Sequence, residues 1–209
     1  MSNINKGIHP FKSFNPLSVP GPLYEDLKTP AASLGKGSSA PTVKVFVGSI
    51  ELPAFAPSGP TEDGQFSVHL PHDFKAGSTP TFHVHWSHTE AAPTGSVVWG
   101  VEVTGAKGYN AGGFVAPVAV STTSAAAAQV DGDPPHTITN DDDMPLPAAL
   151  VAILEPDTEL LCRVFRDTGD PADDFGFDAF FIEIDLHYEI GQIATEERNR
   201  PFPSAGFSP

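Results

Sequence analysis

A chain of 209 residues with 22 prolines, 19 glycines and a single cysteine can hold one β-rich domain with its own core and no disulfide framework. Its 26 acidic residues outnumber its 11 basic ones, and a net charge of −15 repels phosphate backbones, so we expect no nucleic-acid partner. No run of 18 apolar residues is present, so we expect no membrane-spanning helix. Residues 1–11 lack the apolar stretch of a signal peptide, so we expect the protein to be made in a cytoplasm without export.

Residues 1–41 are rich in proline, include a flexible tract at 33–39, and place their apolar residues with no single period. Such a segment cannot build a core of its own. Two interpretations remain: a disordered leader, or an extended arm that becomes ordered against a neighbouring subunit. We favour the arm, and the residues expected to make its contacts are Phe11, Phe14, Leu17, Val19, Leu23 and Tyr24.

From Thr42 onward the apolar residues alternate with polar ones, which is typical of half-buried strands. The pattern predicts strands at residues 43–47, 66–70, 82–87, 97–103, 118–120, 160–164 and 180–188, and leaves 121–129 and 146–154 undecided between helix and strand. No helical pattern long enough for crossovers separates these strands, so we expect antiparallel pairing. The sequence therefore predicts an all-β sandwich or jelly roll over 42–191, with Cys162 buried, followed by an extended tail at 192–209.

The strand at residues 82–87 carries the strongest candidate for chemistry. Phe82, Val84 and Trp86 share one face, and His83 and His85 project from the other, two positions apart, as a pair of metal ligands on a sheet must. The order Gly77, His83, His85 and Glu90 resembles the first motif of the cupins, which bind a metal inside a jelly roll. The second cupin motif is absent, and His187 is the best substitute for its histidine.

The alternative is that these histidines belong to a polar sheet face that is solvated or packed against another subunit. The same side of the alternating strands also carries His69, Glu102, Glu183, Asp185 and His187. We favour that interpretation, expect no cofactor and no enzymatic activity, and keep a structural metal and a cupin-like metalloenzyme as alternatives.

Two further features have competing interpretations. The acidic loop at residues 167–174 offers oxygen ligands for calcium but lacks the order of a known calcium loop, so a turn is favoured. Trp86 and Trp99 lie on apolar faces and are expected in the core, which leaves Tyr109 as the freest aromatic for a carbohydrate-binding module.

Five sequence blocks occur in order along the chain: LPHDF at 70–74, FHVHWSH at 82–88, GSVVW at 95–99, AKGYN at 106–110 and DLHYEIG at 185–191. Together they resemble a family of tailed-phage virion structural proteins over residues 66–191. The resemblance implies a component of an assembled particle, such as a capsid decoration (cement) protein, the base of a head fibre or a tail component. It implies the major capsid protein or other virion proteins as partners, and location in the virion after synthesis in the host cytoplasm.

A structural role in the particle fits the residues as well, since an acidic sandwich with extended ends suits a protein that clamps its neighbours. Closed symmetry is the usual arrangement for such an assembly, and we expect a homo-oligomer, with a homotrimer implied by the family type. The resemblance leaves residues 1–65 and 192–209 uncovered.

Overall fold

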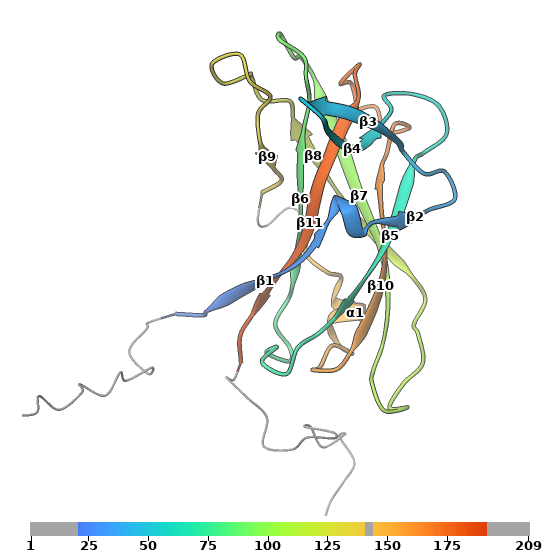
Figure 1. Cartoon of the computed structure of the whole chain (residues 1–209). Coiled ribbons are helices and arrows are strands. Elements are labelled where there is room, and N and C mark those ends of the chain that lie inside the picture. The colour runs from blue at the N-terminus through green and yellow to red at the C-terminus, as the bar shows by residue number, and fades with distance from the viewer. Residues whose placement is uncertain (1–20, 141–143, 192–209) are drawn as a thin grey trace, which may run out of the picture.

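The structure is a computed structural model that describes residues 21–140 and 144–191. In this part of the chain two antiparallel sheets pack face to face as a sandwich (Figure 1), which confirms the all-β prediction. One sheet runs β3 (Thr42–Val47), β4 (Ile50–Phe55), β11 (Ala179–Glu189), β6 (Thr81–Ser87) and β9 (Thr137–Ile138), with β1 (Tyr24–Pro30) also paired to β11. The other runs β2 (Gly35–Lys36), β5 (Asp63–His69), β10 (Glu159–Arg166), β7 (Ser96–Ala106) and β8 (Val118–Ala125).

The pairing of the strands from β4 to β11 is nested. β7 pairs with β8, β6 with β9, β5 with β10, and β4 with β11, all of them antiparallel. This is the pattern of one long hairpin rolled up so that its strands alternate between two sheets. The topology is therefore a jelly roll, as the sequence predicted.

The core lies between the two sheets and is built from the apolar faces that the alternation predicted. Trp86 and Trp99 are fully buried with ring centroids 6.4 Å apart, and Phe55 meets Trp99 edge to face at 5.1 Å. Cys162 is also buried, and the loss of water around it raises the pKa of its thiol. The two tryptophans and the cysteine are thus core residues, as expected.

The folded domain begins earlier than residue 42. β1 pairs with β11 along its whole length, from Tyr24 opposite Glu189 to Pro30 opposite Glu183, and β2 pairs with β5. Leu34, between them, covers Gly64 so closely that a Cβ on that glycine would lie 2.4 Å from the Leu34 side chain. Leu23 and Tyr24 of the expected arm therefore lie against the sandwich, whereas Phe11, Phe14, Leu17 and Val19 lie outside the described residues, as does the expected tail at 192–209.

Other segments differ from expectation in detail. β4 was not predicted, because Glu51 and Pro53 interrupt its apolar pattern. The undecided segment 121–129 is strand as far as Ala125, and 146–154 contains the helical turn α1 (Ala148–Val151); η2 (Ala31–Ser33) is a short 3-10 turn. Across the described ranges, no helix is both long enough and apolar enough to cross a membrane.

Candidate functional site

The polar face of the sheet that contains β6 and β11 gathers histidines and carboxylates from both strands. In the antiparallel register His83 lies opposite Asp185 and His85 lies opposite Glu183. The alternate residues of β6, Phe82, Val84 and Trp86, belong to the buried core. Because neighbouring side chains on a strand point to opposite faces, the histidines point away from the core and toward the outer surface.

Asp185 lies at the centre of this group and is 97% buried (3% exposed). Its Oδ1 lies 3.4 Å from Nδ1 of His83, and its Oδ2 lies 3.3 Å from Nε2 of His85. Oε1 of Glu183 lies 3.6 Å from Nδ1 of His85. We call His83, His85, Glu183 and Asp185 the histidine–carboxylate cluster. Such a set of imidazoles and carboxylates can bind a cation or exchange protons.

Residues on both sides cover the cluster. On one side Nε2 of His136 lies 2.9 Å from Nδ1 of His85. On the other, the ring of His187 stacks on His83 with centroids 5.3 Å apart, and Tyr24 of β1 stacks on His187 at 4.8 Å. Rings from β1 and β11 and from the segment before β9 thus shield the cluster from water, although it lies on the outer face of a sheet.

β1 adds two charged contacts at the border of the cluster. Oδ1 of Asp26 lies 2.7 Å from Nδ1 of His187, and Nζ of Lys28 lies 3.5 Å from Oε1 of Glu183. β1 gave no strand signal in the sequence, so these partners were missed. Only the register of β1 against β11 brings them here.

The cupin-like arrangement expected from His83, His85 and Glu90 differs from the observed one. A cupin metal lies inside the roll, where this chain places Phe82, Val84 and Trp86. Glu90 is not part of the cluster, and its backbone N–H donates to Nδ1 of His88. Glu183 and Asp185 instead lie beside His85, and His187 lies beside His83.

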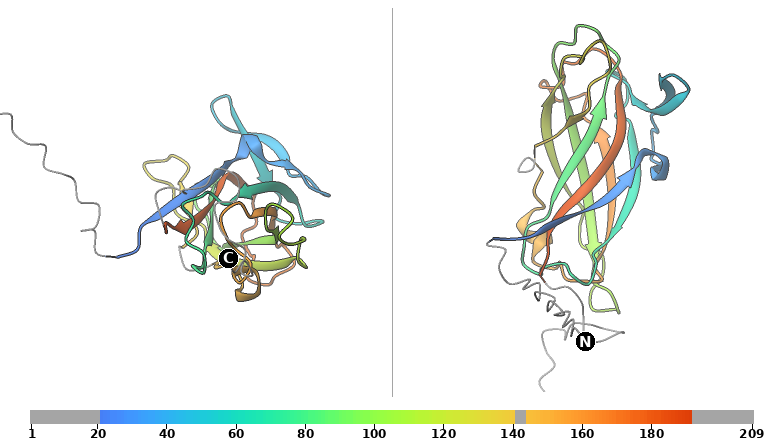
Figure 2. Two further views of the ribbon diagram at one scale, coloured as in Figure 1. Left: turned by 90° about the horizontal axis from the view of Figure 1, so that it is seen from below. Right: turned by 60° about the vertical axis from the view of Figure 1, so that its left-hand side comes forward.

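A second candidate surface is the hairpin formed by β3 and β4. Val43, Val45, Val47 and Ile50 are each between 46% and 61% exposed. Val45 and Val47 pair with Glu51 and Ile50, and β3 is the end strand of its sheet. We call these four residues the apolar strip. In Figure 2 (right) the hairpin stands away from the body of the sandwich.

The opposite side of the hairpin holds it to the rest of the sheet. The ring of Phe46 packs on Phe180 of β11 with centroids 5.1 Å apart. Nζ of Lys44 lies 2.5 Å from Oδ2 of Asp178, just before β11. The apolar strip is therefore presented to solvent by a hairpin that has its own anchor.

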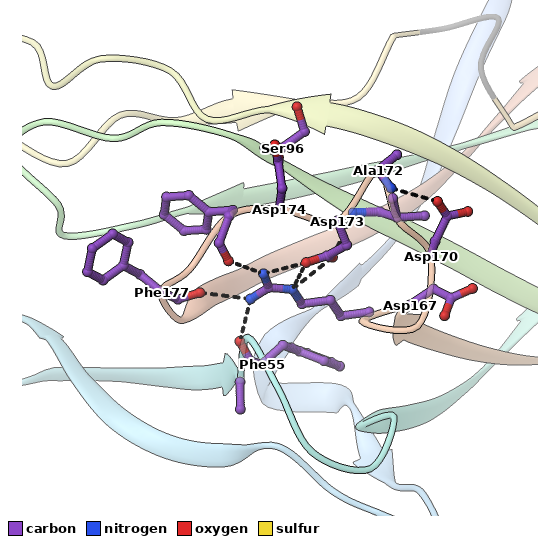
Figure 3. A network of polar contacts seen from close by, with 12 residues as sticks. Phe55, Ser96, Asp167, Asp170, Ala172, Asp173, Asp174 and Phe177 are labelled. Atoms are coloured by element: carbon purple, nitrogen blue, oxygen red, sulfur yellow. Dashed lines mark hydrogen bonds and ion pairs between the residues drawn. The ribbon is translucent and has the colours of Figure 1, made fainter.

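The carboxylates of the acidic loop after β10 form hydrogen bonds with backbone N–H groups and with one buried arginine (Figure 3). Asp167 accepts a hydrogen bond from the N–H of Gly169, Asp170 from that of Ala172, and Asp174 from that of Ser96. Asp173 is bound by the guanidinium of Arg166 and accepts from the N–H of Val98. These carboxylates hold the loop in shape through their hydrogen bonds, which supports the interpretation as a turn.

The remaining aromatic candidate, Tyr109, is 54% exposed in the connection between β7 and β8 and has a positive φ of 56°. Phe114 of the same connection is equally exposed at 54%. Carbohydrate binding by this connection stays a prediction.

No protein-family model matches this chain, and no curated protein matches it. Among solved structures, the chain is similar to one described as the structure of infectious bursal disease virus, Gx strain, with a TM-score of 0.35 and 12% sequence identity. The similarity covers 80% of this chain and 32% of that chain, so the chain spans about a third of the length of the viral protein chain that it matches. The jelly-roll assignment rests on the strand pairing described above and not on this likeness.

Proposed function

We propose that the chain is a structural component of a tailed-phage particle, and specifically a capsid decoration protein that binds and stabilises the head shell. The five sequence blocks that resemble virion proteins lie in the loops and strands of the jelly roll, from the end of β5 to the end of β11. Jelly rolls serve in viral shells, lectins and cupins, so the fold is compatible with this role but does not select it.

The observation that carries the proposal is the apolar strip on β3. A solvent-exposed end strand with valines at every second position exposes both unpaired backbone groups and apolar side chains. Such an edge is often protected by charges, prolines or bulges. β3 has no proline, its pairing with β4 is irregular between Val45 and Val47, and its one charged side chain, Lys44, is turned to Asp178. We infer that the strip docks on the shell protein, which supplies either a further strand or an apolar groove.

Residues 1–20 are proposed as a second attachment, through Phe11, Phe14, Leu17 and Val19. The described chain enters and leaves the domain at one place, since the N–H of Ile190 donates to the carbonyl of Leu23 over 2.8 Å. In Figure 1 this corner lies at the opposite end of the sandwich from β3 and β4. A subunit with contacts at both ends can join two neighbours in a shell, and we propose a homotrimer as the bound form.

The test is binding of the full chain to purified heads that lack it, measured by co-sedimentation. The variant Val43→Thr/Val45→Thr/Val47→Thr keeps the β-branched shape of the strip and adds hydroxyls. The affinity for heads should fall by about tenfold or more. Burying three valine side chains stabilises a complex by more than the ~1.4 kcal/mol that corresponds to a tenfold change in affinity.

The matched control is Val130→Thr/Leu161→Thr, which changes exposed apolar side chains away from the hairpin. It should bind as the wild type does. Equal binding by the strip variant and the control would rule out the apolar strip as the docking surface, and a failure of the wild-type chain to bind any head would rule out the decoration role.

A further inference from the structure

We propose that His85, Glu183 and Asp185 form a binding site for a divalent transition-metal ion of the zinc class, on the outer face of the sheet. One ligand atom from each of these residues lies within 4.8 Å of the other two. Three donors so close together need only small side-chain movements to reach an ion at about 2 Å from each. This inference is independent of the proposed role in the virion.

The burial of Asp185 is the first argument. A buried carboxylate that stays ionised needs hydrogen-bond donors, a cation or a metal ion beside it, because burial removes its water. Oδ1 of Asp185 has no hydrogen-bond partner among the described residues, and the basic side chains beside the carboxylate are those of His83 and His85. An imidazole compensates a carboxylate only when it is protonated. A divalent ion would compensate it at any pH at which the carboxylate is charged.

Asp173 shows how this same chain treats a buried aspartate that is purely structural. Its side chain is 1% exposed, and it faces the permanent charge of Arg166, whose Nη2 lies 2.7 Å from Oδ1. Its other oxygen accepts the N–H of Val98 over 2.9 Å. Asp185 instead lies beside the imidazoles of His83 and His85, and a second carboxylate, Glu183, is close by.

The hydrogen bond between His85 and His136 is the second argument. Nδ1 of His85 lies 2.9 Å from Nε2 of His136, so this nitrogen is occupied and Nε2 remains to face Asp185. When Nδ1 of His85 donates to His136, Nε2 presents a lone pair toward the carboxylate. This is how a metal-binding histidine is usually held by a neighbour, with Nε2 left to take the ion.

The donor set fits the class of ion. One imidazole nitrogen and two carboxylate oxygens suit Zn²⁺ or Mn²⁺, whereas calcium and magnesium prefer oxygen alone. His83, 3.4 Å from Asp185, is close enough to serve as a further ligand or as a partner of Asp185. An ion here would join β6 to β11, whose register shifts between Phe181 and Glu183.

The experiment titrates the full chain, freed of metal with a chelator, with ZnCl₂ and in parallel with MnCl₂ in a calorimeter. We expect one ion per chain and a higher melting temperature in its presence. Asp185→Asn and Glu183→Gln should each weaken binding by more than about 100-fold, and His136→Gln by about 10- to 100-fold. Glu183→Gln is included because its side chain is 22% exposed, so this variant should fold even if Asp185→Asn does not.

The matched control is His69→Gln. His69 also lies near two carboxylates, with Nε2 3.3 Å from Asp157 and Nδ1 3.2 Å from Glu159, but its side chain is 59% exposed. The control should bind zinc as the wild type does. No binding by the wild type, unchanged binding in Glu183→Gln, or lost binding in His69→Gln would each overturn the proposal.

Discussion

Arg166 and Asp173 form an ion pair in the interior of the sandwich, with Nη2 2.7 Å from Oδ1 and both side chains at most 1% exposed. The guanidinium also donates to the carbonyls of Phe55, Phe175 and Phe177. The pair thus ties the end of β4 and the loop before β11 to the end of β10 (Figure 3). All three guanidinium nitrogens of Arg166 donate hydrogen bonds, so removing the arginine or the aspartate leaves buried polar groups without partners.

Replacing one member of this pair should destabilise the fold strongly. We expect Asp173→Asn to lower the free energy of unfolding by about 3–5 kcal/mol, since it leaves the buried Arg166 charge uncompensated. Denaturant unfolding followed by tryptophan fluorescence measures this. The reference is Glu102→Gln, which breaks the ion pair between Glu102 and Arg163. These side chains are 38% and 33% exposed, so this variant should lower the free energy of unfolding by less than about 1 kcal/mol. Similar costs for both variants would contradict the assignment.

Tyr188 should make the fold sensitive to alkali. Burial, followed by the nearby Asp73 and then Glu25, raises the pKa of its hydroxyl. The folded state therefore keeps this proton at a pH where the unfolded chain, with a pKa near 10, has lost it. Stability is then unaffected below about pH 10 and falls as the pH rises above that value.

The Tyr188→Phe variant tests this behaviour. Its unfolding free energy should fall less steeply above about pH 10 than that of the wild type. At neutral pH it should be about 1 kcal/mol less stable, because the hydroxyl lies 3.2 Å from both Glu25 and Asp73 and donates to one of them. Tyr109→Phe, in an exposed connection, is the reference. An alkaline slope that is the same in Tyr188→Phe and the wild type would refute the assignment.

Cys162 should be chemically silent in the folded protein. It is buried on β10, and burial, together with the charge of Glu159, raises the pKa of its thiol, so the reactive thiolate is scarce. A thiol reagent at mildly alkaline pH should label less than about one chain in ten per hour without denaturant, and should label all chains rapidly in denaturant. Rapid labelling of the folded chain would show that β10 opens or is less covered than described.

Residues 1–20 should matter for attachment and not for the stability of the domain. We expect Phe11→Ser/Phe14→Ser/Leu17→Ser to weaken binding to heads by about tenfold or more while the melting temperature is unchanged, because apolar contact is lost only in the complex. Phe202→Ser/Phe207→Ser, beyond the last described residue, is the matched control. If the first variant binds as the control does, the arm has no part in docking.

The sequence predicted the faces of the long strands well because period two decides them locally. Phe82, Val84 and Trp86 are core and His83 and His85 are on the other face, as their order required. The same rule does not say whether an apolar face is covered: Val43, Val45 and Val47 alternate just as well and are exposed, because β3 ends its sheet.

The histidine–carboxylate cluster could be anticipated only in part. Glu183 and Asp185 were expected on the polar side of their strand, but their closeness to His85 depends on the register between β6 and β11, almost a hundred residues apart in sequence. The cupin-like pattern included Glu90 instead, because Glu90 is near His85 in sequence. β1 was missed for a related reason: its strand is held by pairing with β11 and not by a pattern of its own.

The nested pairing also has a consequence for how the chain is made. β4 can pair with β3 as soon as both are made, but it cannot pair with β11 until that strand, at the other end of the hairpin, has left the ribosome. The outermost pairs close the largest loops and cost the most entropy, so the domain should fold late in translation and slowly. A chain that stops short of Ala179 would leave β1, β4 and β6 without their common neighbour, and its exposed strand edges would make it prone to aggregate during synthesis.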